Sequence, residues 1–113
     1  MRELTIKRIK AKAACLMKVK FYMADDDKND LTIAGIKCRF LGAIKNGKEA
    51  TFEISNDEQV IFAILDRFSK DRCNDRLKIA AGDKNITITG KNILSPVDGN
   101  PFIFDKNLEK EPS

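Results

Sequence analysis

The chain has 113 residues, of which 42% are hydrophobic and 34% charged, and its formal net charge is +4. These values predict one globular domain and exclude wholesale disorder, and no apolar stretch approaches the roughly 18 residues of a membrane span. The chain has no histidine, which excludes Ser-His-Asp and Cys-His catalytic arrangements and removes the commonest metal ligand.

The N-terminal sequence MRELTIKRIK lacks the apolar core of a signal peptide. We therefore expect a cytoplasmic protein, unless a leader or anchor has been removed, and we leave open its attachment to a membrane or surface assembly through other segments. The cysteines Cys15, Cys38 and Cys73 are dispersed and odd in number, which fits a reducing compartment better than a disulfide framework. Cys15 and Cys38 fall within apolar runs, where a free thiol packs as a small hydrophobic side chain.

Basic residues gather in the first 20 positions of the chain, where Glu3 alone is acidic. A basic end of this kind can contact nucleic acid, an anionic membrane surface or an acidic partner. The alternative is a solvated strand face, or lysines that protect an edge strand from aggregation. The residues concerned are Arg2, Lys7, Arg8, Lys10, Lys12, Lys18 and Lys20.

Alternation of apolar and polar residues predicts strands in the first part of the chain. The first strand is expected at 4–6 and a long second strand at 15–24. The polar residues 25–30 predict a loop, and 31–33 predict a short strand before a turn at Ala34-Gly35. The faces of the second strand are expected to be Cys15, Met17, Val19, Phe21 and Met23 on one side and Leu16, Lys18, Lys20, Tyr22 and Ala24 on the other.

The most distinct local signal is Asn46-Gly47, which lies between two runs of alternating apolar residues. Both residue types tolerate a positive φ, which a tight type I′ turn requires at two successive positions. The sequence therefore predicts a β-hairpin within 31–54, with one buried face, as the central strand pair of the fold.

Residues 55–68 allow two interpretations. Ser55 and Glu58 form a capping-box pattern, and apolar residues follow at helical spacing, which predicts a helix at 56–68. The unbroken apolar run from Val60 to Leu65 also has the length and the β-branched content of a strand that is buried on both faces. We favour the strand.

The remaining strands are expected at 77–79, 86–89 and 102–104, with breaks at 81–84, 90–92 and 98–100. About 7–9 short strands separated by Gly, Asn and Asp predict an all-β fold, an antiparallel β-sandwich of the immunoglobulin-like or jelly-roll-like kind. The alternative is an α+β fold with a helix at 56–68. One domain is expected at 1–105, followed by a flexible C-terminal tail at 106–113.

Part of the chain resembles the core repeat of bacterial PEGA-type and related immunoglobulin-like modules. The resemblance rests on the Gly35 spacing, Leu41-Gly42, 46–49 and Phe52-x-Ile54. In that repeat a strand pair shows a Gly-x-apolar step followed by a tight turn that contains glycine. More loosely, the chain is similar to small uncharacterised bacterial proteins of the same layout. The resemblance supports the strand at 60–65 and implies a binding or scaffolding role, usually in attachment to something larger.

The acidic loop at 25–30 is the best candidate metal site in the sequence. Asp25, Asp27 and Asn29 occupy positions 1, 3 and 5 of a calcium-loop pattern, but Asp30 replaces its glycine and Ile36 replaces its bidentate glutamate. These departures favour a solvated loop. The dispersed cysteines do not have the close spacing of a zinc site. We expect no metal ion, no cofactor and no catalytic residue.

The sequence predicts a non-enzymatic binding or interaction module of unknown ligand, acting alone or in a larger assembly, with a protein as its partner. Rigid sandwiches commonly place function on their loops. The candidate contact surfaces are the basic face of 16–24 and the loops around 25–30, 69–74 and 91–100. The candidate binding residues are Lys18, Lys20, Tyr22, Lys91, Asn92 and Asn100.

Two alternative functions stay open. The first is a basic small β-barrel that binds single-stranded nucleic acid through Lys18, Lys20 and Tyr22, since such binders combine cations with exposed aromatic rings. The second is an enzyme that uses carboxylates or Cys73, which lies in a polar loop. The other aromatic residues are expected in the core, namely Phe21, Phe40, Phe52, Phe62, Phe102 and Phe104.

Overall fold

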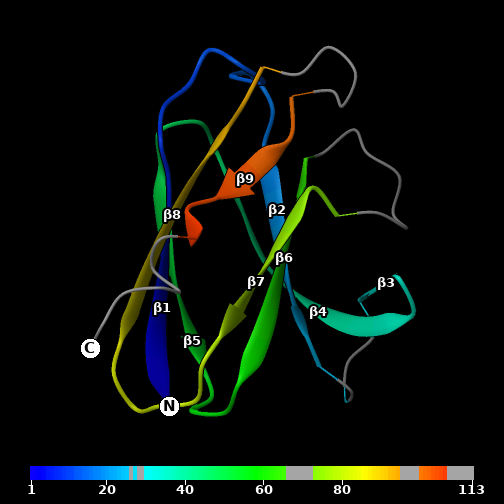
Figure 1. Ribbon diagram of the computed structural model, residues 1–113, viewed down its shortest axis with the longest axis vertical. Coiled ribbons are helices and arrows are strands. Elements are labelled where there is room, and N and C mark those ends of the chain that lie inside the picture. Colours follow the sequence, from blue (N-terminus) through cyan, green and yellow to red (C-terminus); the bar gives the residue numbers. More distant parts are fainter. Residues whose placement is uncertain (26, 28–29, 66–72, 95–99, 107–113) are drawn as a thin grey trace.

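The computed structural model describes the chain except for residues 26, 28–29, 66–72, 95–99 and 107–113. The described residues form nine strands in two packed layers (Figure 1) and contain no α-helix. The strands are β1 Arg2–Arg8, β2 Val19–Ala24, β3 Leu31–Ile33, β4 Ile36–Ile44, β5 Glu49–Ile54, β6 Gln59–Leu65, β7 Asp75–Ile79, β8 Ile86–Asn92 and β9 Phe102–Phe104.

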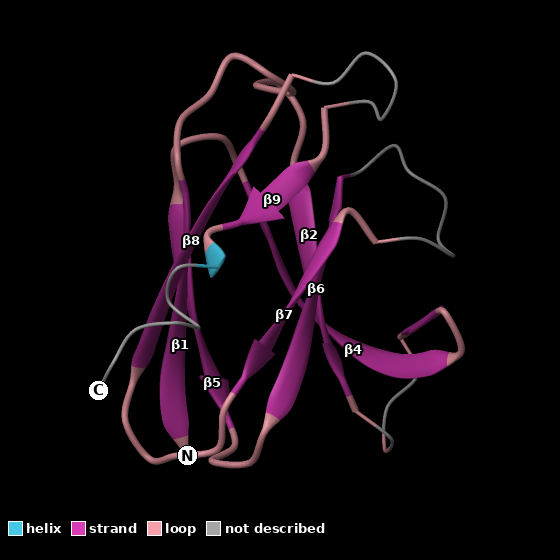
Figure 2. Ribbon diagram, in the orientation of Figure 1, coloured by secondary structure: helices cyan, strands magenta, loops and turns pink. Residues whose placement is uncertain are grey.

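The strands form a four-stranded sheet of order β5-β1-β8-β9 and a five-stranded sheet of order β3-β4-β2-β6-β7. The predicted all-β sandwich is therefore confirmed, and Figure 2 shows its two layers of strands. One pairing departs from the predicted antiparallel arrangement, because β1 and β8 run parallel to each other. The N-terminal strand thus lies inside its sheet, between β5 and β8.

The main core fills the space between the two sheets. Strand β1 alternates buried and more exposed residues along its whole length, so it is longer than the predicted 4–6. The rings of Phe21, Phe102 and Phe104 meet across the two sheets, and the Phe21 and Phe102 centroids lie 5.3 Å apart in an edge-to-face arrangement. Such aromatic pairs add to the stabilisation from buried area alone.

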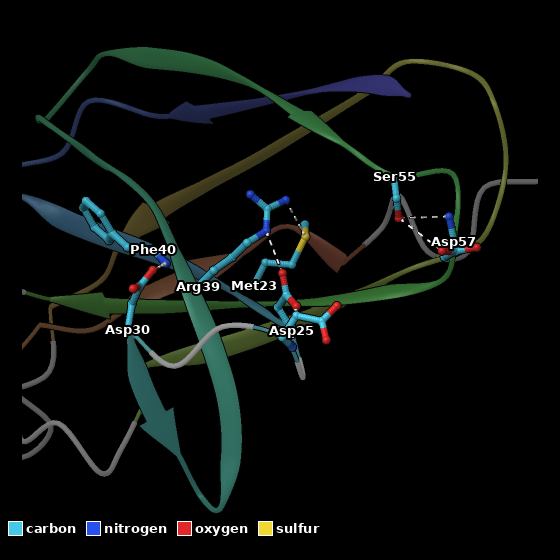
Figure 3. Close-up of polar contacts among 8 residues, drawn as sticks. Met23, Asp25, Asp30, Arg39, Phe40, Ser55 and Asp57 are labelled. Carbon is cyan, nitrogen blue, oxygen red and sulfur yellow. Dashed lines mark hydrogen bonds and ion pairs between the residues drawn. The ribbon is translucent and has the colours of Figure 1, made fainter.

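The segment at 60–65 is a strand, as favoured above. Ile61, Ala63 and Leu65 face the main core, whereas Phe62 and Ile64 belong to a second apolar cluster on the other face of the same sheet. Burial on both faces explains the unbroken apolar run. Ser55 does not cap a helix, because the strand β6 follows at Gln59. Its Oγ accepts a hydrogen bond from the nitrogen of Asp57 at 3.3 Å in the connection between β5 and β6 (Figure 3).

The predicted hairpin at Asn46-Gly47 is wrong. A turn does form there, with the nitrogen of Lys48 donating to the carbonyl of Lys45 at 3.0 Å. However, β4 pairs with β2 and β3, whereas β5 pairs with β1 in the opposite sheet. The turn therefore carries the chain from one sheet to the other. The strand pair that the PEGA-type resemblance implies at this point is absent for the same reason.

Turn geometry accounts for this result. Gly47 has a φ of 73°, but Asn46 is not among the residues with positive φ, so the turn has the pattern of type II and not of type I′. Only the primed turns match the twist of two paired strands, and a type II turn lets them diverge. The Asn46 side chain instead bonds both backbone groups of Ala11 at 2.9 Å, which ties the connection between β1 and β2 to this turn.

The true two-residue hairpin joins β3 and β4 at Ala34-Gly35. Both residues have positive φ, 50° and 82°, as a type I′ turn requires, and they separate the paired residues Ile33 and Ile36. The predicted turn at this position is confirmed. The sequence analysis did not predict that β3 and β4 pair directly across this turn, because alanine is not a residue type that indicates a positive φ.

Several predicted boundaries and burials also need correction. Strand β2 begins at Val19, so Cys15 is not a strand residue, and its side chain is exposed. The break predicted at 90–92 lies inside β8. Phe40 was expected in the core but is 44% exposed. Of the predicted tail at 106–113, residues 107–113 lie outside the described residues, while Lys106 forms an ion pair with Asp75 at 2.6 Å.

Candidate functional site

The residues predicted to bind a partner do not form one surface. Lys18 is exposed in the segment before β2, while Lys20 and Tyr22 share a half-buried face of that strand. Lys91 is exposed on β8 in the opposite sheet. Asn100 is half-buried, and its carbonyl accepts a hydrogen bond from Nδ2 of Asn92 at 3.0 Å.

Asn92 is a structural residue and not an exposed contact. It is 3% exposed, and its Oδ1 accepts a hydrogen bond from Nε of the fully buried Arg8 at 3.1 Å. The other guanidinium nitrogens of Arg8 donate to the carbonyls of Ala14, Met17 and Ile44 at 2.6–3.0 Å. Arg8 thus holds together the β1–β2 connection, the end of β4 and the end of β8 at one end of the sandwich.

Arg2 performs the same role at the other end of β1. Its Nε donates to the carbonyl of Ser55 at 3.0 Å, and its Nη2 donates to the carbonyls of Asp57 and Ala80 at 3.1 and 2.8 Å. Figure 1 shows the N-terminus, the β5–β6 connection and the β7–β8 connection at this end of the molecule. The burial of both arginines could have been predicted from the sequence, because Arg2 and Arg8 alternate in phase with the core residues Leu4 and Ile6.

Burial of these arginines reduces the predicted basic surface. Both are less than 5% exposed, so neither contributes an accessible cation to the basic end of the chain. The remaining cations of that end are lysines at exposed or half-buried positions, namely Lys7, Lys10, Lys12, Lys18 and Lys20.

A groove of about 930 Å³ lies between β7 and β8, where the two sheets separate. Leu77 and Ile79 line it from β7, and Ile86 and Ile88 line it from β8. The β7–β8 connection, residues 80–85, and the side chain of Arg2 complete its lining. No sequence pattern predicted this groove, because alternation assigns its lining residues only to a core and does not show that they come from both sheets.

Arg2 supplies a hydrogen-bond donor to the groove. The residue is 4% exposed, and its Nη1 forms no hydrogen bond with the part of the chain that the structure describes. A Cβ added to Gly82, which also lines the groove, would lie 3.5 Å from this Nη1. Nη1 keeps contact with water, because among the described residues the buried side-chain polar atom without a partner is Oε1 of Gln59. An anionic or carbonyl oxygen in the groove could accept a hydrogen bond from Nη1.

Cys38 and Cys73 are poor candidates for a reactive thiolate. Cys73 is half-buried, and burial, the largest effect on it, raises its pKa. Cys38 is buried, and burial raises its pKa as well. A thiol whose pKa is raised stays protonated at neutral pH and is a poor nucleophile. Cys38 packs as the sequence predicted, within the second apolar cluster.

The acidic loop is tied to β4. Oδ2 of Asp25 lies 3.4 Å from Nε of Arg39, and Oδ2 of Asp30 accepts a hydrogen bond from the nitrogen of Phe40 at 2.9 Å (Figure 3). Of the calcium-loop positions, Asn29 lies outside the described residues. Among the residues that are described, no three His, Cys, Asp or Glu side chains are grouped so that they could hold a metal ion.

No protein-family model matches this chain, and no curated protein is significantly similar to it in sequence. In the described ranges of the chain, no helix is long and apolar enough to cross a membrane.

Proposed function

We propose that this chain is a non-enzymatic binding module and that its ligand occupies the groove between β7 and β8. One observation carries the proposal: an apolar groove of about 930 Å³ contains the Nη1 of Arg2, which has no acceptor among the described residues. Ligand sites typically combine apolar walls with a few convergent polar groups. The chemistry favours a ligand with an apolar body and an anionic or carbonyl oxygen.

Amide chemical shifts provide the test. Titration of the isotope-labelled protein with anilinonaphthalene sulfonate, an apolar anion, is expected to shift the amides of 77–88 before any others. Ile86→Asp places a carboxylate in the groove and should weaken binding by about fivefold or more, because like charges repel in a poorly hydrated site. Ile93→Asp makes the same change at an exposed site outside the groove lining and should leave binding unchanged.

Shifts centred elsewhere, or an equal effect of the two aspartate variants, would contradict the proposed site. Thermal unfolding of both variants establishes that each is folded. A protein that shows no shift at millimolar probe would have no groove site for apolar anions.

A second candidate function is single-stranded nucleic acid binding, favoured by an aromatic pair that the sequence did not predict. The rings of Tyr22 and Phe40 lie 5.3 Å apart, and Phe40 is 44% exposed. Lys20 shares the face of Tyr22 on β2. Exposed rings beside cations can stack on unpaired bases.

Fluorescence anisotropy with mixed-sequence single-stranded DNA tests this second candidate. At about 50 mM salt, binding should be submicromolar and should fall steeply as salt is added, because bound cations release counterions from phosphates. Phe40→Ala should weaken it by about fivefold or more, since stacking on one ring contributes this much. Phe52→Leu, on a strand of the other sheet, is the control. Absence of binding at that salt concentration would eliminate this function.

A further inference from the structure

Strand β8 has a partner along most of one edge but along only part of the other. On one edge, β1 pairs with β8 from Ile86 to Gly90. On the other edge, β9 pairs with β8 only from Gly90 to Asn92. Figure 1 shows the short β9 beside one part of the longer β8. The part of β8 that begins at Ile86 therefore has no described strand on the β9 side.

The hydrogen bonds at Thr89 and Gly90 show which residue presents this open edge. The carbonyl of Thr89 accepts from Asp105, just after β9, at 2.8 Å, and the carbonyl of Gly90 accepts from Ile9, just after β1, at 2.8 Å. In a strand, the backbone groups of successive residues point to alternate edges. The N–H and carbonyl of Thr87 therefore point to the β9 side, where no described strand pairs with them.

The groove lies along this open edge. Ile86 and Ile88, on either side of Thr87, line it together with Leu77 and Ile79 of β7. An extended peptide that added to the edge of β8 could place alternate side chains among these apolar residues and bond its backbone to Thr87. An aliphatic molecule would make no use of the backbone groups of Thr87, so the open edge favours a peptide.

Arg2 determines the direction of such a peptide. In the β1–β8 register Leu4 is opposite Ile86, so Arg2 lies two residues farther along, at the level of Lys84. A strand antiparallel to β8 on its β9 side would run from the level of Thr89 toward Lys84 and end at the level of Arg2, whose guanidinium bonds the carbonyl of Ala80 in the β7–β8 connection. Antiparallel pairs are also the commoner kind. The chain end at this position would be a C-terminus, whose carboxylate could accept a hydrogen bond from Nη1 of Arg2.

The charges around the groove fit an acidic chain end. Its lining includes Arg2, Lys78 and Lys84 against Asp83 as the only acidic residue. Lys78 lies 3.4 Å from Glu58, but both side chains of this pair are more than half exposed, so the pair is weak. Lys84 is an exposed cation close to the level at which the peptide would end.

We propose that the groove binds the extended C-terminal segment of a partner protein, which adds to β8 as an antiparallel strand beside Thr87 and places its terminal carboxylate on Nη1 of Arg2. The distance from Thr89 to Asn85 accommodates about four residues of strand. This inference rests on the proposed function, because it names the ligand class of the same groove.

Fluorescence anisotropy with synthetic peptides tests the inference on the full chain. The probes are labelled tetrapeptides with valine, isoleucine or leucine at alternate positions, each made with a free C-terminal carboxylate and as the C-terminal amide. The acid is expected to bind about tenfold or more tightly than its amide, because a charge-assisted hydrogen bond to a buried arginine is lost. Methylation of alternate peptide nitrogens should abolish binding, since it blocks strand pairing.

Matched variants separate the parts of the site. Lys84→Glu should weaken binding of the acid by about threefold or more, whereas Lys91→Glu, the same change on β8 outside the groove, should leave it unchanged. Thr87→Pro removes the outward N–H without removing a bond to β1 and should reduce binding of every peptide. Arg2→Gln should remove the preference for the acid, and Lys84→Glu and Thr87→Pro keep the test decisive if Arg2→Gln does not fold.

Two outcomes would overturn the inference. The first is that none of the tetrapeptides binds more tightly with a free C-terminal carboxylate than as its C-terminal amide. The second is binding of decanoate that Thr87→Pro does not change, without peptide binding, which would assign the groove to aliphatic acids. Either outcome is distinguishable from failure of the proposed function, because the shifts that anilinonaphthalene sulfonate produces at 77–88 report on the groove independently of any peptide.

Discussion

Replacing Arg8 with methionine is expected to lower the free energy of unfolding by about 3–5 kcal/mol, the cost of removing one partner from a buried charged network. The guanidinium is 1% exposed and satisfies one amide oxygen and three backbone carbonyls. Methionine fills a similar volume but donates no hydrogen bond, so these oxygens stay buried without partners. Each such group costs about 1–3 kcal/mol.

Burial itself opposes the charge on Arg8, since loss of hydration, the largest effect on this group, lowers its pKa. No carboxylate among the described residues pairs with it, so the stabilisation comes from neutral oxygen acceptors. Arginine suits this position because its five N–H donors lie in a fixed planar arrangement. Lysine has a single nitrogen and cannot reach acceptors on several segments, so Arg8→Lys should also destabilise the protein, by a smaller amount.

Urea unfolding, followed by circular dichroism, measures the effect of the Arg8 variants. Lys7→Met is the matched control, because Lys7 is the neighbouring cation on β1 and is exposed. This control should remain within about 0.5 kcal/mol of the parent protein. The interpretation of Arg8 fails if its methionine variant unfolds within about 1 kcal/mol of the control.

Gly90→Ala is expected to destabilise the protein by about 3 kcal/mol, at the upper end of the cost of overpacking a core. A Cβ at this position would collide with Cζ of Phe102 and would lie 2.7 Å from the carbonyl oxygen of Ile103. The ring of Phe102 is fully buried against Phe21, and the oxygen belongs to the paired strand β9. Neither neighbour can move without disturbing the core or the pairing of β8 with β9.

Gly82→Ala provides a comparison for the same chemical change. Its added Cβ would meet only Nη1 of Arg2, at an ordinary contact distance of 3.5 Å. Because alanine reduces the entropy of the unfolded chain, this variant should match the parent protein or gain up to about 1 kcal/mol.

The double variant Gly90→Ala with Phe102→Leu separates the two contacts of Gly90. It should be less destabilised than the sum of its single variants, since leucine relieves the ring contact but leaves the carbonyl contact. Equal unfolding midpoints for Gly90→Ala and Gly82→Ala would show that β9 adapts freely to the added methyl group.

Local patterns in the sequence predicted most strands but not their partners. The apolar run at 60–65 indicated a strand buried on both faces, and β6 is that strand. Asn46-Gly47 indicated a turn correctly, but the hairpin that usually accompanies such a turn does not form. Alternation shows that a strand has an inner face, and both sheets of a sandwich offer one, so it does not specify which sheet the strand joins.

The candidate site was less predictable than the fold. Of the six predicted binding residues, Asn92 is buried in the Arg8 network, and the others lie on β2, on β8 and in two connecting segments. The sequence analysis named Arg2 only among the basic residues of the first 20 positions. Its phase with Leu4 and Ile6 was a usable signal, because a cation in register with core residues has to find acceptors inside the fold.

Alternation and turn residues act within a few positions of one another, so local patterns were enough to predict an all-β sandwich of short strands. They did not predict that β1 lies parallel to β8, that β4 and β5 belong to opposite sheets, or that a groove lined by Arg2 lies between β7 and β8. These features depend on contacts between segments that are distant in the chain. They arise where backbone pairing and burial are satisfied together across the whole molecule, which no local pattern records.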